Sequence, residues 1–140
     1  MRRYLIVGNQ TLAGSHLTAK VRELHEQEPS SFYIVVPATP PHGHSWSEGE
    51  ARDIASRRLE TTLARLRGIG VEAEGEVGDE RPTYAIQDVL AHRAFDEIIV
   101  STLPPGASRW LKRDLPHRIE VEFGLPVTHL IGTSEPVPRR

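Results

Sequence analysis

Polar side chains that can hold an anion occur at two points of the chain, each at the end of a short apolar run. Asn9 and Thr11 follow the first apolar run, and Ser101 and Thr102 close a later one. Hydroxyl and amide groups donate hydrogen bonds to phosphate and carboxylate oxygens. These four residues contain no pair of acid and base and no activated nucleophile. The chemistry they predict is therefore binding of a small anionic ligand.

The segment after Thr102 is the most distinctive in the sequence. Pro104 and Pro105 predict a stiff turn, and a serine and an arginine follow it. A guanidinium beside hydroxyls can neutralise and orient a phosphate or carboxylate. The alternative is that the prolines only shape the loop and the cations are solvated. The full set of anion-binding candidates is Asn9, Thr11, Ser101, Thr102, Gly106, Ser108 and Arg109.

Two histidines one residue apart, His42 and His44, are the weak candidates for metal binding, and Glu48 would be a third ligand. Zinc sites need three or four convergent ligands, and this pair falls in a predicted loop. We therefore expect no metal site.

No catalytic residue is predicted. Ser15 and Ser108 both lie outside the Gly-x-Ser-x-Gly context that exposes a nucleophile, and the commonest phosphate-binding glycine motifs are absent. His129 falls in a predicted strand, where packing or an interface is expected. Four further histidines fall on helical patterns among polar neighbours and are expected at the surface: His16, His25, His92 and His117.

The candidate residues are positioned by β-strands, and the sequence predicts five strands. The unbroken apolar runs 4–7, 32–36 and 98–100 are typical of strands buried on both faces. Residues 71–77 alternate, with three glutamates on one side, which indicates a strand with one wet face. Residues 127–131 are mixed in character. We place the last two strands at the edges of the sheet.

Helical periodicity fills the gaps between the strands. Ser47 and Glu50 have the spacing of a capping box, and Gly68 ends the longest apolar stripe. Asp114 is the predicted N-cap of the last helix, which Gly124 ends. The apolar positions that define the four stripes lie within residues 17–24, 51–66, 85–90 and 115–123.

Alternating strands and helices predict a doubly wound α/β fold with a parallel five-stranded sheet. Placing the third and fifth strands at the edges selects the flavodoxin-like order 3-2-1-4-5. In such sheets ligands bind beyond the carboxyl ends of the strands, between strands 1 and 4, where the anion-binding candidates fall. Residues 1–132 are predicted to form one domain, followed by a flexible tail at residues 133–140.

Composition narrows the class of protein. The 140 residues carry 17 Lys and Arg against 19 Asp and Glu, a net charge of −2, which disfavours a nucleic-acid partner. There is no cysteine, so thiol chemistry is excluded. No apolar run approaches the roughly 18 residues of a membrane span, and no membrane association is expected. A cytoplasmic location is the default expectation.

Three segments give the sequence a family resemblance. The opening strand 4–7, the step Asp96–Ser101 and the step Phe123–Thr128 resemble, in order and spacing, the universal stress protein family from Arg3 to Ile131. The resemblance implies a flavodoxin-like fold of the adenine nucleotide alpha hydrolase type and a role in the stress response. It also implies a homodimer formed through the fifth strand, with His129 near the interface.

Some members of that family bind ATP through a glycine motif, which this sequence lacks. The first two glycines fall on Ser101 and Pro104, and the final pair on Arg113 and Asp114. Glycine brings backbone N–H groups close to phosphates, and proline has no N–H to offer. The resemblance therefore implies a divergent member without this ATP motif and without a required cofactor.

Three functions follow from these observations. The first is a non-enzymatic domain that binds a small ligand or regulates a partner. The second is a divergent nucleotide-binding protein, with ATP or AMP between strands 1 and 4. The third is a small hydrolase or transferase that uses the same residues.

Overall fold

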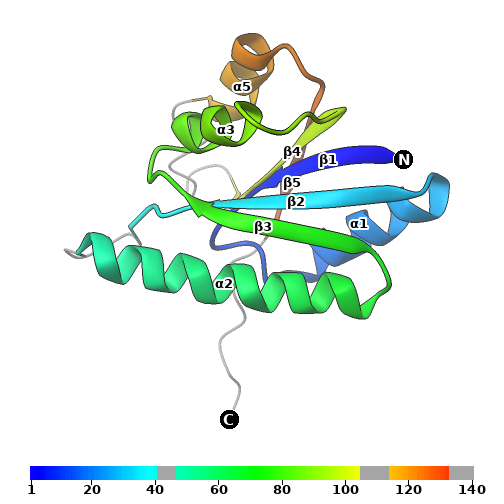
Figure 1. Cartoon of the computed structure of the whole chain (residues 1–140), viewed down its shortest axis with the longest axis horizontal. Coiled ribbons are helices and arrows are strands. Elements are labelled where there is room, and N and C mark those ends of the chain that lie inside the picture. Colours follow the sequence, from blue (N-terminus) through cyan, green and yellow to red (C-terminus); the bar gives the residue numbers. More distant parts are fainter. Residues whose placement is uncertain (41–46, 105–113, 133–140) are drawn as a thin grey trace.

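A computed structural model of the chain describes residues 1–40, 47–104 and 114–132. Five strands and four labelled helices alternate along these ranges (Figure 1). Their bounds are β1 Arg2–Val7, α1 Ser15–Gln27, β2 Ser30–Pro37, α2 Glu48–Gly68, β3 Glu72–Gly78, α3 Pro82–Leu90, β4 Glu97–Thr102, α5 Leu115–Phe123 and β5 Val127–Ile131.

The strands form one parallel sheet in the order β3-β2-β1-β4-β5. This confirms the predicted fold class and strand order. The three apolar runs are the central strands, because β-branched and aromatic side chains fill both faces there. The alternating strand β3 lies at one edge, with Glu72 and Glu74 exposed.

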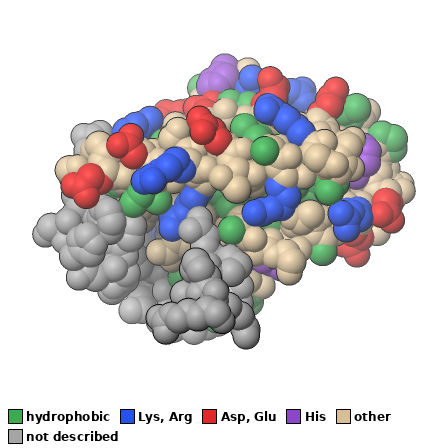
Figure 2. All heavy atoms as spheres, turned by 90° about the horizontal axis from the view of Figure 1, so that it is seen from below, with side chains coloured by type: hydrophobic (Ala, Val, Ile, Leu, Met, Phe, Trp, Pro, Cys, Tyr) green, Lys and Arg blue, Asp and Glu red, His purple; other side chains and the backbone are tan. Residues whose placement is uncertain are grey.

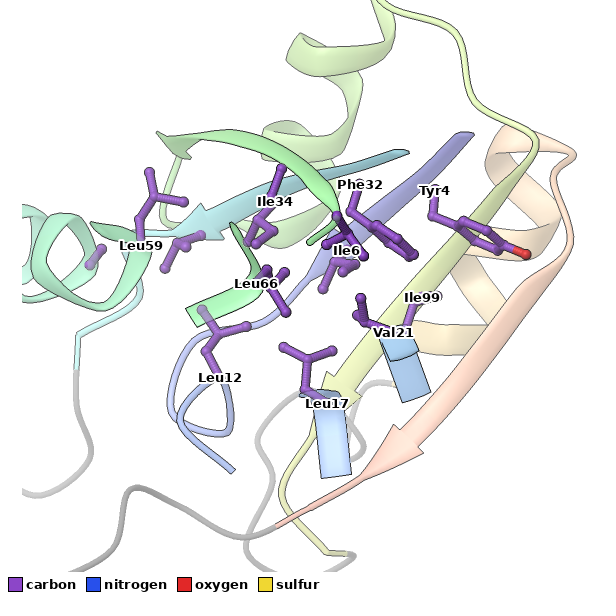
Figure 3. Close-up of a cluster of buried hydrophobic side chains, with 14 of the residues drawn as sticks. Tyr4, Ile6, Leu12, Leu17, Val21, Phe32, Ile34, Leu59, Leu66 and Ile99 are labelled. Carbon is purple, nitrogen blue, oxygen red and sulfur yellow. The ribbon is translucent and has the colours of Figure 1, made fainter. Parts of the chain in front are cut away.

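Helices α1 and α2 cover one face of the sheet, and α3 and α5 cover the other (Figure 1). Alternate residues of each strand enter the two cores, because successive side chains point to opposite faces. In β1, Ile6 packs with Leu17 and Val21 of α1, as Figure 3 shows. Leu5 and Val7 pack instead with α3 and α5. This alternation decides which helix each side chain at the end of a strand can reach.

The helix ends agree with the sequence signals in part. The Ser47 hydroxyl accepts a hydrogen bond from the Glu50 backbone N–H at 3.1 Å, which confirms the predicted start of α2. Gly124 ends α5 with a left-handed φ of 67°. Asp114 stands at the N-cap of α5, but it adopts φ 53° and ψ 45° and its carboxylate makes no capping bond. The predicted N-cap position of Asp114 is therefore confirmed, but its side chain does not cap the helix, because capping side chains typically need an extended backbone.

None of the helices within the described ranges combines the length and apolar character needed to cross a bilayer.

Candidate functional site

The loop between β1 and α1 folds over the carboxyl end of β4. The Thr11 and Ser101 hydroxyls lie 2.5 Å apart, and each residue is only 1% exposed. Gly8 allows this approach, since a Cβ there would lie 2.8 Å from Leu12 Cδ2 and 3.3 Å from the Ser101 Cβ. Two of the predicted site residues, 90 positions apart in the sequence, are thus in direct contact.

His16, at the start of α1, completes this cluster. Its Nε2 lies 3.1 Å from Ser101 Oγ, so the serine hydroxyl has two partners. A side chain at Gly14 or Gly132 would collide with the imidazole ring. Burial lowers the pKa of His16 below its ordinary value of 6.5, so the ring is neutral at pH 7. We call Thr11, Ser101 and His16 the hydroxyl–imidazole cluster.

The sequence prediction had placed His16 at the surface with the other helical histidines. The ring is instead half-buried against β4. The burial of His16 could not be predicted from its polar neighbours along the helix. Those neighbours indicate which face of α1 is exposed, but not what its first turn contacts. A signal was present in the glycines on either side of the ring, Gly14 and Gly132, but only the fold brings them together.

Asn9 connects the same loop to β2, the neighbour of β1 on the other side from β4. Its Nδ2 donates to the Pro37 carbonyl at the end of β2 at 2.8 Å, and its Oδ1 accepts from Arg58 Nη1 of α2 at 2.6 Å. The amide is 6% exposed and is held on both sides. In this geometry Asn9 positions the loop, and Arg58 is a second residue near the site that the sequence did not single out.

Thr102 is separated from Ser101 by the sheet itself. Because neighbours on a strand point to opposite faces, Thr102 lies on the side of α3 and α5. Its Oγ1 lies 2.6 Å from His129 Nε2 and donates to the Leu103 carbonyl at 2.9 Å. The single hydroxyl proton is used by that carbonyl, so His129 must donate from Nε2. Burial also lowers the pKa of His129.

The turn after β3 adds an acidic group to this end of the sheet. The Asp79 carboxylate accepts hydrogen bonds from the backbone N–H and the Nε of Arg81, at 2.8 and 2.9 Å. These bonds lower the pKa of Asp79 to about 2. The carboxylate therefore stays charged, and the paired Arg81 guanidinium offsets that charge.

The remaining predicted residues cannot be placed. Gly106, Ser108 and Arg109, and the histidines His42 and His44, all lie outside the described residues. Within the residues that are described, no group of three or more His, Asp or Glu side chains is arranged to hold a metal ion.

The hydroxyl–imidazole cluster has two chemical readings. A neutral imidazole 3.1 Å from a serine hydroxyl is the arrangement of a base and a nucleophile. However, Ser101 Oγ is also bonded to Thr11 and is closed to solvent. In the described part of the chain no carboxylate bonds the His16 ring to orient it as catalytic triads require. The geometry therefore favours a positioning role over nucleophilic attack.

The parallel sheet, its strand order and the helices on both faces define a doubly wound, flavodoxin-like α/β fold. A universal stress protein from Archaeoglobus fulgidus has a similar structure, with a TM-score of 0.63 and 14% sequence identity over 92% of this chain and 93% of that one. At this identity the likeness establishes the fold. Comparisons with family models and with curated protein sequences gave no match.

Proposed function

We propose that this protein is a non-enzymatic domain that binds a small anionic ligand and regulates a partner. The ligand would lie beyond the carboxyl ends of β1 and β4. The observation that carries the proposal is the hydroxyl–imidazole cluster at this point, where parallel α/β sheets bind ligands. The resemblance to universal stress proteins, with their fold, agrees with a regulatory role in the cytoplasm.

The predicted loop residues supply the groups that the cluster lacks. The Ser101 hydroxyl is already bonded inside the cluster, which positions the loop, and Ser108 and Arg109 follow it in sequence. In this proposal Arg109 neutralises the anion and the Ser108 hydroxyl orients it, as charged hydrogen bonds do in phosphate and carboxylate sites. We call this location the β1/β4 site.

A homodimer through β5 is part of the proposal. This strand is an edge of the sheet, with hydrogen-bonding groups that no described strand uses on its outer side. Ile131 at its end is 51% exposed, which adds an apolar contact for a second copy. Size measurement by sedimentation would show a dimer, and a monomer at high protein concentration would contradict this part.

The β1/β4 site is tested by a thermal-shift panel of ATP, AMP and inorganic phosphate. We expect a stabilising shift with at least one of them. Arg109→Ala should weaken the binding free energy of that ligand by about 1.5–3 kcal/mol, which is the contribution of a charged hydrogen bond. The matched control is Arg118→Ala, an exposed arginine on α5. No shift with any of the three, or equal losses in both variants, would contradict the proposal.

A nucleotide is the second candidate for this site, because universal stress proteins, which this sequence resembles, include members that bind ATP. The same panel separates the two. A shift with ATP or AMP that phosphate does not produce would favour nucleotide binding, and a shift with phosphate alone would favour the simpler anion site.

Hydrolase or transferase activity is the third candidate, and the Ser101–His16 distance is the observation that favours it. Labelling with a fluorophosphonate probe tests it directly. We expect no labelling of Ser101, because its hydroxyl is closed to solvent. Labelling that disappears in Ser101→Ala would overturn the non-enzymatic assignment.

A further inference from the structure

The His16 ring joins three parts of the molecule. It lies between Gly14, in the β1–α1 loop, and Gly132, directly after β5, and a Cβ at either glycine would collide with it. Its Nε2 lies 3.1 Å from Ser101 Oγ at the end of β4. The Gly132 backbone N–H also donates to the Thr102 carbonyl at 2.9 Å, which extends the pairing of β4 with β5. The loop, β4 and the end of β5 therefore meet at one imidazole.

The hydrogen bonds of the hydroxyl–imidazole cluster have one direction. Thr11 is 1% exposed, and within the described part of the chain Ser101 Oγ is the one partner of its hydroxyl. Thr11 therefore donates to Ser101, because a buried hydroxyl proton without an acceptor is costly. Ser101 must then donate its own proton to His16 Nε2. This order predicts a neutral ring that carries its proton on Nδ1.

Protonation of His16 breaks this order. An imidazolium ring is a donor at both nitrogens, so Nε2 no longer accepts from Ser101. Ser101 then donates to Thr11, and the Thr11 proton is left without an acceptor in the cluster. The ring also lies in the first turn of α1, where the positive end of the helix dipole disfavours a cation. Both effects favour release of the protonated ring from the cluster.

The charged groups around the ring give its protonated form no ion-pair partner within residues 1–40, 47–104 and 114–132. Lys20, one turn further along α1, pairs with Glu23 at 2.8 Å, and Arg65 of α2 donates to a carbonyl of the loop at 3.1 Å. His129 of β5 lies on the other face of the sheet. Acidic and basic side chains are mixed over the α2 side of the molecule, as Figure 2 shows. The buried contacts, and not a surface patch of one sign, therefore decide the charge of His16.

We propose that His16 is a pH-sensitive latch, whose neutral ring fastens the β1–α1 loop to the ends of β4 and β5 and whose protonation releases the loop. Asn9 and Arg65 still hold the first part of the loop, so the release is confined to the part around Gly14. The latch itself needs no ligand. Its effect on affinity rests on the proposed β1/β4 site, where a released loop weakens binding in acid.

NMR spectroscopy of the ligand-free full chain tests the latch. At about pH 7.5 the ring is neutral, and we expect its nitrogen shifts to show the tautomer protonated at Nδ1. The Gly14 amide is bonded to the Thr11 carbonyl at 3.1 Å, so its hydrogen exchange reports release of the loop. Once the ring shifts show that His16 is protonated, the protection of this amide should fall about tenfold or more. Amides of the central strand β2 should keep their protection.

Two variants of α1 separate the latch from other effects of acid. His16→Gln retains a hydrogen-bonding side chain but does not titrate, so it should remove the pH dependence at Gly14. His25→Gln, in the last turn of the same helix, is the matched control and should leave that dependence unchanged. The tautomer is read from the unaltered chain, so it tests the proposal without any substitution.

Each other outcome is decisive. A ring protonated at Nε2 at neutral pH would overturn the proposal, because Ser101 could not donate to it. An equal loss of protection in β2 would show unfolding of the whole domain, and a loss that persists in His16→Gln would assign it to another group; either would overturn the latch. Release of the loop without a thermal shift by ATP, AMP or phosphate would support the latch and contradict the β1/β4 site. A thermal shift without release of the loop would contradict the latch alone.

Discussion

Ser101→Ala tests whether the hydroxyl–imidazole cluster holds the β1–α1 loop against β4. The substitution removes a hydroxyl that lies 2.5 Å from Thr11 Oγ1 and 3.1 Å from His16 Nε2. Thr11 is 1% exposed, and its hydroxyl has no other partner in the described part of the chain. A buried hydroxyl left without a hydrogen-bond partner lowers the stability by about 1–3 kcal/mol. The half-buried His16 can instead form a hydrogen bond to water. We expect the free energy of unfolding to fall by about 2 kcal/mol.

A double-mutant cycle isolates the pair. Thr11→Val keeps the shape of the side chain and removes its hydroxyl. The double variant Thr11→Val/Ser101→Ala therefore has no unpaired hydroxyl at position 11. Replacing both partners of a buried hydrogen bond by apolar groups costs less than the sum of the single changes. We expect a coupling energy of about 1 kcal/mol or more between Thr11 and Ser101.

Urea unfolding followed by circular dichroism measures both quantities. The slope of the unfolding free energy with urea should stay constant, because the change is local. A loss below about 0.5 kcal/mol in Ser101→Ala, within the usual range of a surface substitution, would refute the reasoning. So would additive effects in the cycle, because additivity is the behaviour of residues without contact.

Two further predictions concern stability. Burial lowers the pKa of His16 and His129 below 6.5, so the unfolded chain takes up protons first and the Tm should fall as the pH drops through 6.5. Replacing both by Gln should flatten that fall in a plot of Tm against pH, and an unchanged slope would contradict the burial of the two rings. Gly75→Ala places a Cβ 2.3 Å from the Ile34 carbonyl oxygen and should cost about 2 kcal/mol or more in urea unfolding. Gly68→Ala, with open space around it, is the control, and equal losses in the two variants would exclude the predicted collision.

The fold could be predicted because the hydrophobic pattern distinguishes the strands. Continuous apolar runs marked β1, β2 and β4 as central, and the glutamates of β3 marked it as an edge. The cap at Ser47 could also be predicted, since it depends on residues three apart. Asp114 shows the limit of such local signals, because residue spacing predicts its place at the N-cap but not its left-handed backbone.

The candidate site was predictable only as a location. The contact of Thr11 with Ser101 follows from the strand order, but the separation of Thr102 follows from alternation along β4 and could have been read from the sequence. The roles of His16 and Arg58 could not be predicted, because their partners lie 85 and 49 residues away and only the fold brings the glycines around the His16 ring together. Contacts of this kind depend on how the loop folds, which no periodicity records.

The two ties of the β1–α1 loop have a consequence for the dynamics of the protein. Asn9 joins the loop to β2 and Thr11 joins it to β4, across 28 and 90 residues of sequence. The loop therefore cannot open as an ordinary surface connection does without breaking buried hydrogen bonds to strands on both sides of β1. Its amide hydrogens, including that of Gly14 on the Thr11 carbonyl, should exchange with solvent as slowly as those of the central strands. We therefore expect the connection beside the proposed β1/β4 site to open together with the central strands.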